Sequence, residues 1–174
     1  MKNVVFVSGN YGSGKSTLCR NYSLKTKWKH ITASSLITKT VGERYEESKS
    51  VKDISLNQDK LISEISALPP GDYLLDGHTV ILNSNKQPEC ISVDVFSKIG
   101  IQAIILVRTD EDKILQRIRE RESFNYSVKE VKLINDLEYK MAKEISEGLD
   151  IPLKIIDSSI NQFDKSLKEI EEFL

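Results

Sequence analysis

A glycine-rich segment near the amino terminus constrains the fold of this chain more than any other feature. Residues Gly9 to Ser16 read GNYGSGKS and match the pattern G-x-x-x-x-G-K-[ST] at every defined position. The apolar run Val4 to Val7 precedes the segment, and a stretch with helical spacing follows it. Glycines let the backbone turn so that successive amides at the start of a helix point inward and bind phosphate. The segment therefore predicts a strand, a phosphate-binding loop and a helix, in that order.

Each part of this loop has an expected role at a nucleoside triphosphate. We expect Lys15 to place a positive charge between the β- and γ-phosphates and to act in catalysis, and the Ser16 hydroxyl to coordinate Mg²⁺. A glycine-rich turn without a ligand is the alternative, which the coincidence of four specified residues with the right flanking elements disfavours. The loop residues expected to bind the nucleotide are Gly9, Asn10, Tyr11, Gly12, Ser13, Gly14, Lys15, Ser16 and Thr17.

Short apolar runs rich in β-branched residues alternate with segments of helical spacing along the chain. Continuous hydrophobicity over a short run is typical of a parallel strand that helices cover on both faces. The expected strands are Val4 to Val7, Tyr73 to Leu75, Ile101 to Val107 and Leu153 to Ile156, with a weaker candidate at His30 to Thr32. The expected helices are Ser16 to Lys25, Asn57 to Leu68, Glu111 to Arg121, Val128 to Glu147 and Gln162 to Leu174. The predicted class is therefore α/β, with helices on both faces of the sheet and one domain over residues 1–174.

Composition excludes several kinds of partner. The chain has 174 residues and is 39% hydrophobic, which is enough for one core. Its 25 basic and 26 acidic residues nearly cancel, so no positive field is available to hold a nucleic acid without a specific site. The longest apolar run, Ile101 to Val107, is far shorter than the roughly 20 residues of a membrane span. We expect a cytoplasmic protein with no membrane or nucleic-acid partner, and no expectation follows for its oligomeric state.

A second part of the expected site follows the run Tyr73 to Leu75. Asp76 stands at the end of that strand, where strand ends face the ligand crevice, and an acid at this place would act in catalysis by holding Mg²⁺ from the far side. An aspartate that caps the next turn is the alternative. His78 lies two residues later and would orient an attacking hydroxyl or water, or hydrogen-bond to Asp76. The chemistry of a single histidine is equally compatible with a structural role.

Arginines gather after the run Ile101 to Val107. Arg108 ends this run, and Arg117 and Arg121 follow at i, i+4 spacing on one face of the next helix. A guanidinium keeps its charge and donates to two phosphate oxygens at once. We therefore expect Arg108 to bind the nucleotide, and Arg117 and Arg121 to act in catalysis. A solvated helix with ion pairs is the alternative, which we favour only for Arg119.

Three blocks of the sequence, GNYGSGKST, LLDGH and VRTDEDKILQRIRER, resemble the nucleoside monophosphate kinase group of P-loop proteins. The resemblance is closest to the small adenylate kinases of the isoenzyme-six and archaeal type, in which the acid lies in a D-x-H sequence that Asp76-Gly77-His78 matches. It implies a three-layer P-loop fold around a five-stranded parallel sheet in the order 2-3-1-4-5. It also implies an acceptor-binding region near residues 34–57, a short lid near residues 120–127 and an adenine contact near residues 157–161.

The resemblance further implies a reaction and an acceptor site. We expect transfer of the γ-phosphate of ATP, with Mg²⁺, to AMP or a related nucleoside monophosphate. A hydroxylated turn at Thr32 to Ser35 resembles the place where the acceptor base is read, and the acceptor-site candidates are Ser34, Ser35, Lys39 and Arg44. Typical adenylate kinases use more than one arginine for the acceptor phosphate, whereas this region offers only Arg44. A small metabolite or nucleoside is therefore an alternative acceptor, and an AAA family-like ATPase that acts as a switch or assembly factor is a third alternative.

Overall fold

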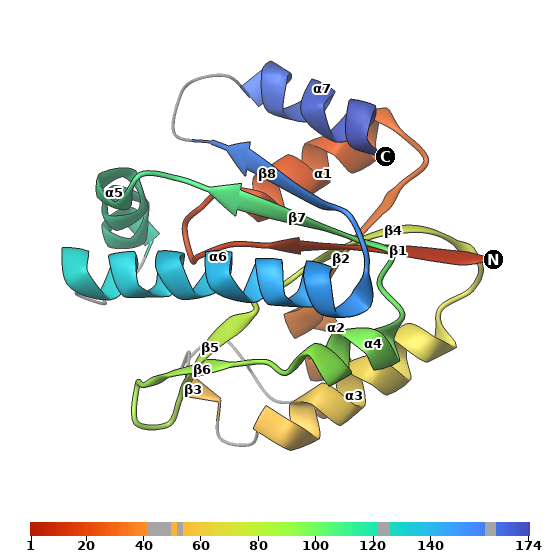
Figure 1. The fold of residues 1–174 in the computed structure, drawn as a ribbon, viewed down its shortest axis with the longest axis horizontal. Coiled ribbons are helices and arrows are strands. Elements are labelled where there is room, and N and C mark those ends of the chain that lie inside the picture. The colour runs from red at the N-terminus through yellow and green to blue at the C-terminus, as the bar shows by residue number, and fades with distance from the viewer. Residues whose placement is uncertain (42–49, 52–53, 122–125, 159–162) are drawn as a thin grey trace.

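Five parallel strands form the central sheet of the computed structural model, which describes residues 1–41, 50–51, 54–121, 126–158 and 163–174 (Figure 1). Across the sheet the order is β2 (Lys29–Thr32), β4 (Gly71–Asp76), β1 (Lys2–Ser8), β7 (Ala103–Arg108) and β8 (Leu153–Asp157). Every neighbouring pair is parallel. Numbered within this sheet alone, the order is 2-3-1-4-5, which confirms the predicted fold class and order.

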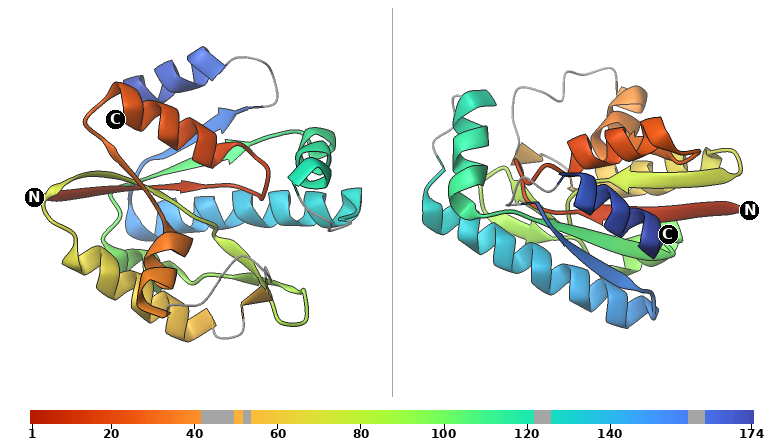
Figure 2. Two further views of the ribbon diagram at one scale, coloured as in Figure 1. Left: turned by 180° about the vertical axis from the view of Figure 1, so that it is seen from behind. Right: turned by 90° about the horizontal axis from the view of Figure 1, so that it is seen from above.

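Helices cover both faces of this sheet (Figure 1). One face carries α1 (Lys15–Lys25) and α7 (Phe163–Phe173). The other face carries α2 (Ala33–Val41), α3 (Ile54–Ala67), α4 (Val93–Ile99) and α6 (Val128–Leu149). A further helix, α5 (Glu111–Arg121), lies beyond the carboxyl ends of β1 and β7 (Figure 2). None of the described helices is long and apolar enough to cross a membrane.

Each face of the sheet packs against its helices in a separate apolar cluster. Alternate residues of one strand belong to different clusters, because successive side chains of a strand point to opposite faces. In β1, Val4 and Phe6 belong to the cluster formed with α2, α3, α4 and α6, whereas Val5 and Val7 belong to the cluster formed with α1 and α7. Burial on both faces explains why the strand reads as a continuous apolar run.

The sequence did not predict a small second sheet, which combines a short strand that precedes β4 in the chain with two strands that follow it. It contains β3 (Ser50–Val51), β5 (Val80–Asn83) and β6 (Pro88–Cys90), in the order β3-β5-β6. β5 and β6 form an antiparallel hairpin in which Asn83 Oδ1 accepts from the amides of Asn85 at 2.9 Å and Gln87 at 3.1 Å. This Asx turn reverses the chain, and the hairpin packs against α6.

Two helices, α2 and α4, also went unpredicted. The segment Thr32 to Ser35 was interpreted as a hydroxylated turn, but α2 begins within it at Ala33. The hydroxyls act on the helix start, since Thr32 Oγ1 accepts from the Ser35 amide at 3.1 Å. Strand β2 therefore passes into α2 without an intervening loop.

Candidate active site

The site lies at the carboxyl edge of the central sheet, where three parallel strands end side by side (Figure 1). Strand β1 leads into the glycine-rich loop, β4 ends at Asp76 and β7 ends at Arg108. The parallel topology thus brings together three blocks that are far apart in the sequence.

Three glycines determine the path of the loop. Gly9, Gly12 and Gly14 have φ angles of +146°, +76° and +94°, which L side chains rarely adopt. A Cβ atom on Gly9 would lie 2.4 Å from the carbonyl oxygen of Val107. The loop therefore runs against β7 with no space for a side chain, and its glycines suit a backbone cradle for phosphate.

Asn10 anchors the loop to α6. Its Nδ2 donates to Val131 O at 3.1 Å and to Asn135 Oδ1 at 2.9 Å, and its Oδ1 accepts from the Tyr11 amide at 2.7 Å. The Asn10 side chain is thereby engaged within the protein, so a contribution of Asn10 to nucleotide binding would come from its backbone.

Two hydroxyls that come directly after β7 and β8 contact the far side of the loop. Thr109 Oγ1 and Ser158 Oγ lie 2.8 Å and 2.6 Å from Ser13 O and also contact each other. Because each hydroxyl has one proton, one of them donates to Ser13 O and the other can donate to its neighbouring hydroxyl. The Ser13 side chain is buried, and Thr17 lies exposed in the first turn of α1. The sequence analysis did not identify these contacts of Thr109 and Ser158, because neither residue belongs to a motif that names its partner.

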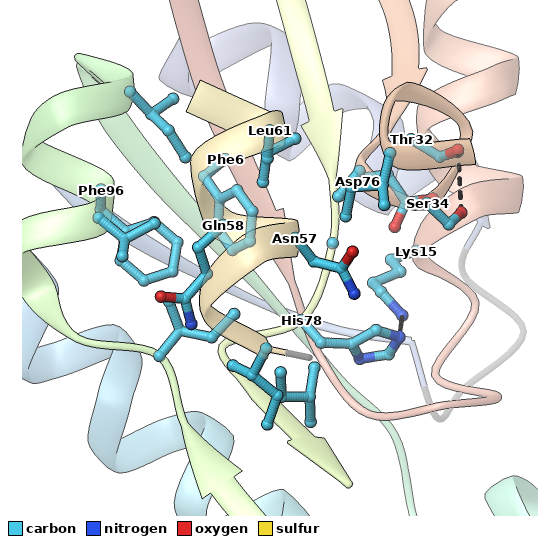
Figure 3. Close-up of a pocket in the computed structure, with 18 of the residues that line it drawn as sticks. Phe6, Lys15, Thr32, Ser34, Asn57, Gln58, Leu61, Asp76, His78 and Phe96 are labelled. Atoms are coloured by element: carbon cyan, nitrogen blue, oxygen red, sulfur yellow. Dashed lines mark hydrogen bonds between the residues drawn. The ribbon is translucent and has the colours of Figure 1, made fainter. Parts of the chain in front are cut away.

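Lys15 and His78 point toward each other (Figure 3). Lys15 Nζ lies 3.3 Å from His78 Nε2 and 3.4 Å from Asn10 O, and the Lys15 side chain is buried. The ring of Tyr11 stacks on His78 with a centroid separation of 4.0 Å. The loop lysine and the histidine of the D-x-H sequence therefore form one cluster.

Asp76 is also buried, and His30 Nε2 lies 3.3 Å from its Oδ2 atom. Burial favours the protonated form, but hydrogen bonds from His30 and Ser16 and the charge of Lys15 hold the pKa of Asp76 below its usual value. Asp76 is therefore a carboxylate at neutral pH. In the sequence His30 appeared only within a weak strand candidate, so its contact with Asp76 was missed.

The donor set suits Mg²⁺. Ser16 and Asp76 are oxygen donors that line one cavity, and Mg²⁺ commonly takes one or two protein oxygens besides phosphate and water. Magnesium held there would neutralise charge on the phosphate oxygens.

Glu138 on α6 is the main residue that the sequence analysis missed. It is 1% exposed, and its carboxylate accepts from Thr79 N at 3.2 Å, Thr79 Oγ1 at 2.6 Å and Val80 N at 3.3 Å. Its Oε1 atom lies 3.5 Å from His78 Nδ1. The available signal was an acidic residue at helical spacing between Ile134 and Met141 in the buried stripe of α6.

The predicted arginines differ in their surroundings. Arg117 Nη1 donates to Gly12 O at 2.8 Å, so this side chain lies against the glycine-rich loop. The Arg108 guanidinium lies 5.3 Å from the centre of the Tyr139 ring. Arg121 closes α5, and its side chain lies outside the described residues.

A cavity of about 350 Å³ opens beside this cluster (Figure 3). Its polar end is formed by Lys15, Ser16, Asp76 and His78, and its other end lies between the helices α2, α3 and α4. The apolar lining residues include Phe6, Ile37, Leu61, Val95 and Phe96. The cavity is therefore polar at the loop and apolar inside the protein.

The predicted acceptor residues are only partly placed at this cavity. Ser34 lines it, whereas Ser35 Oγ donates to Thr32 O at 2.8 Å. The side chain of Lys39 and the whole of Arg44 lie outside the described residues. Asn57 and Gln58 of α3 line the cavity and were not singled out, because the periodicity of α3 predicted a helix but not the element that it faces.

Comparisons with known proteins agree with this architecture. Shikimate kinase from Acinetobacter baumannii, solved in complex with shikimate, is similar at a TM-score of 0.65 and 12% identity, over 99% of this chain and 93% of that one. Shikimate kinase from Bacteroides thetaiotaomicron is similar at a TM-score of 0.60 and 12% identity, over 98% of this chain and 97% of that one. No curated protein matches the sequence significantly. At this identity the structural likeness shows a shared fold alone.

The family is shown by the sequence itself. Residues 8–135 match a family described as an AAA domain, and this match includes the glycine-rich loop, the D-x-H sequence and α5. The chain therefore has the fold of a P-loop kinase and belongs to this AAA domain family.

Proposed function

We propose that the chain transfers the γ-phosphate of ATP to a small acceptor that binds in the cavity beside Lys15. The position of this cavity carries the proposal, because Lys15, Ser16 and Asp76 form its polar end while Phe6 and Phe96 lie deeper inside. Hydrolysis needs only a water molecule beside the phosphate. A largely apolar cavity of about 350 Å³ suits the body of a second substrate instead.

The residues around the loop have separate roles in this proposal. The loop amides and Lys15 would hold the phosphates of ATP, and Ser16 and Asp76 would hold Mg²⁺. Arg117, which donates to Gly12 O in the loop, would stabilise charge on the transferred group. As an acceptor oxygen bonds to the γ-phosphorus, the bond from this phosphorus to the bridging oxygen breaks and ADP leaves.

A nucleoside monophosphate, with AMP first, is the acceptor that we favour. The rings of Phe6 and Phe96 line the deep part of the cavity, where they would give a base apolar contact. The amides of Asn57 and Gln58 supply both donors and acceptors at the same cavity. In this proposal Lys39 and Arg44 contact the acceptor phosphate.

An uncharged acceptor is the second candidate, and the charge of the cavity favours it. Among the described lining residues, Lys15 is the single lysine or arginine, and it would also bind the nucleotide phosphates. An acceptor phosphate would share Lys15 or depend on residues outside the described part of the chain. A nucleoside or a small hydroxylated metabolite needs no such cation.

A measurement of ADP formation from Mg²⁺-ATP tests the proposal. The panel contains AMP, the other nucleoside monophosphates, adenosine and shikimate, with Lys15→Ala as the inactive control. We expect AMP to stimulate ADP formation most. Stimulation by adenosine alone would instead favour an uncharged acceptor. Equal ATP consumption with and without every acceptor would overturn phosphotransfer in favour of a slow ATPase.

A further inference from the structure

His78 lies between a cation and a buried carboxylate. Its Nε2 atom is 3.3 Å from Lys15 Nζ, and its Nδ1 atom is 3.5 Å from Glu138 Oε1. The ring stacks on Tyr11 and its side chain is 17% exposed. The two ring nitrogens therefore face opposite charges on opposite sides of the ring.

Glu138 also holds the backbone that follows this ring. Its carboxylate accepts from Thr79 N, Thr79 Oγ1 and Val80 N, which come directly after His78 in the chain. A buried carboxylate is costly unless donors surround it. These three donors satisfy part of the hydrogen-bonding capacity of the Glu138 carboxylate. Its remaining polar neighbour among the described contacts is His78 Nδ1.

The neighbours of the ring select one tautomer. An ammonium group has donors only, so Nε2 must accept from Lys15. A neutral imidazole that accepts at Nε2 carries its proton on Nδ1. Nδ1 is buried, and its polar neighbour among the described contacts is Glu138 Oε1, at the long distance of 3.5 Å. An unprotonated Nδ1 would direct its lone pair toward this carboxylate, whereas a protonated one directs its N–H there.

The charge state agrees with this geometry. Burial and the nearby Lys15 charge hold the pKa of His78 below its usual value, although Glu138 and Asp76 act in the opposite direction. The contact with Lys15 itself requires a neutral ring, because an Nε2 atom that accepts from an ammonium group carries no proton.

We propose that Glu138 is a positioning residue that holds His78 in the Nδ1–H tautomer, so that Nε2 accepts from Lys15 and aims the ammonium group in the loop. This arrangement connects α6 to the phosphate-binding lysine through one imidazole. The effect of this arrangement on nucleotide binding rests on the proposed function, whereas the tautomer of His78 does not depend on that function.

Nitrogen NMR of the imidazole rings tests the tautomer directly. The chain has 2 histidines, so ¹⁵N-histidine labelling gives two rings, which a His30→Asn variant assigns. We expect an N–H at Nδ1 of His78 and an unprotonated Nε2, although free imidazole in water prefers the opposite tautomer. An Nε2–H or doubly protonated His78 at pH 7 would overturn the proposal, whether or not any variant folds.

Glu138→Gln tests the cause, because its carboxamide keeps one acceptor oxygen but can place an N–H opposite Nδ1. We expect the His78 signals to move toward the Nε2–H tautomer. Glu144→Gln is the matched control on α6, since Glu144 has a side chain 47% exposed and pairs with Lys140 on the surface. Unchanged His78 signals in a folded Glu138→Gln protein would contradict the proposal.

The affinity for nucleotide distinguishes a positioning role of Glu138 from a purely structural one. Calorimetry with Mg²⁺ and a non-hydrolysable ATP analogue is expected to give affinity at least about tenfold weaker for Glu138→Gln. Thr79→Val removes the shortest donor to Glu138 but leaves the carboxylate beside His78, and we expect its effect to stay below about threefold. Equal losses in both variants would assign Glu138 a structural role alone.

A double-variant cycle completes the test. Once His78→Asn has removed the ring, Glu138→Gln should weaken binding little further, because the two residues act through one contact. Additive losses would overturn the proposal. An absence of acceptor-stimulated ADP formation would instead refute the proposed function and leave the tautomer result standing.

Discussion

Gly9 and Gly100 share a positive φ angle, +146° and +75°, but their surroundings differ. A Cβ atom on Gly9 would lie 2.4 Å from Val107 O, whereas one on Gly100 would meet no described atom within 4 Å. Gly100→Ala should therefore cost only the backbone strain of about 1–2 kcal/mol. Gly9→Ala should cost about 1–3 kcal/mol more through overpacking. Urea unfolding of both variants measures the difference between their free energies of unfolding. Equal stabilities would contradict the close packing of Gly9 against β7.

Lys15 is the residue on which the proposed reaction depends most. Lys15→Ala should lower kcat/KM at least about 100-fold, because it removes a preorganised positive charge from the phosphates. Lys25→Ala is the matched control in the same helix, since Lys25 lies at the opposite end of α1 from the loop and its side chain is 64% exposed. Steady-state ADP formation measures both, and full turnover by Lys15→Ala would contradict the mechanism.

Residues of the site were predictable where a motif fixed their chemistry and their element together. Lys15 and Asp76 each follow a strand that the apolar pattern identifies, so their convergence followed from the parallel topology. Glu138 and His30 belong to no such motif. Their contacts depend on which loop or strand each one packs against, and that is decided by the tertiary fold rather than by local spacing.

Among the elements, α6 connects most parts of the site. Asn135 accepts from Asn10 and donates to Glu111 at 3.1 Å, one turn before Glu138 reaches Thr79. Positions three or four residues apart share a helix face, so one face of α6 contacts the glycine-rich loop and the turn after β4. The apolar spacing predicted the helix nearly to its ends, but the partners of its polar residues were not predictable from that spacing.

The amino terminus of α6 has a capping box that supports this helix. Ser127 Oγ accepts from Glu130 N at 3.2 Å, and Glu130 Oε2 accepts from Ser127 N at 2.7 Å. Ser127→Ala should lower the free energy of unfolding by about 1 kcal/mol at pH 7, as measured in urea. Ser146→Ala is not a suitable control, since Ser146 Oγ donates to Ile151 O, whereas exposed Lys129→Ala should change stability little.

The same box predicts a pH dependence. Hydrogen bonds from the Ser127 amide and hydroxyl hold the pKa of Glu130 below its usual value. The ionised carboxylate therefore contributes stability above its unfolded pKa, and this contribution is lost as the pH falls through the lower folded pKa. We expect the stability difference between wild type and Glu130→Gln to shrink in acid. A difference that grows as the pH falls would contradict this.

At the scale of the whole molecule, the sheet divides two apolar clusters, and the cavity enters only one of them. Phe6, Leu61 and Phe96 belong both to the cluster on the α6 side and to the cavity wall. The central sheet was predictable because its buried strands are continuous apolar runs. The small sheet was not, because β3 and β6 have only 2 and 3 residues, and β3 pairs with a strand about 30 residues further along the chain.

Nucleotide binding is coupled to the stability of the whole molecule, because the glycine-rich loop exists only in the folded chain. A ligand that binds only the folded chain stabilises it by about 2.7 kcal/mol at 100 times its Kd. For a chain of this size each kcal/mol shifts Tm by about 2–4 °C, so a non-hydrolysable ATP analogue with Mg²⁺ should raise Tm by about 5–10 °C. The shift should shrink without Mg²⁺ and disappear in Lys15→Ala, while Lys25→Ala should retain it. A thermal-shift series over analogue concentration measures this, and a wild-type Tm that stays constant up to millimolar analogue would refute a nucleotide site at the glycine-rich loop.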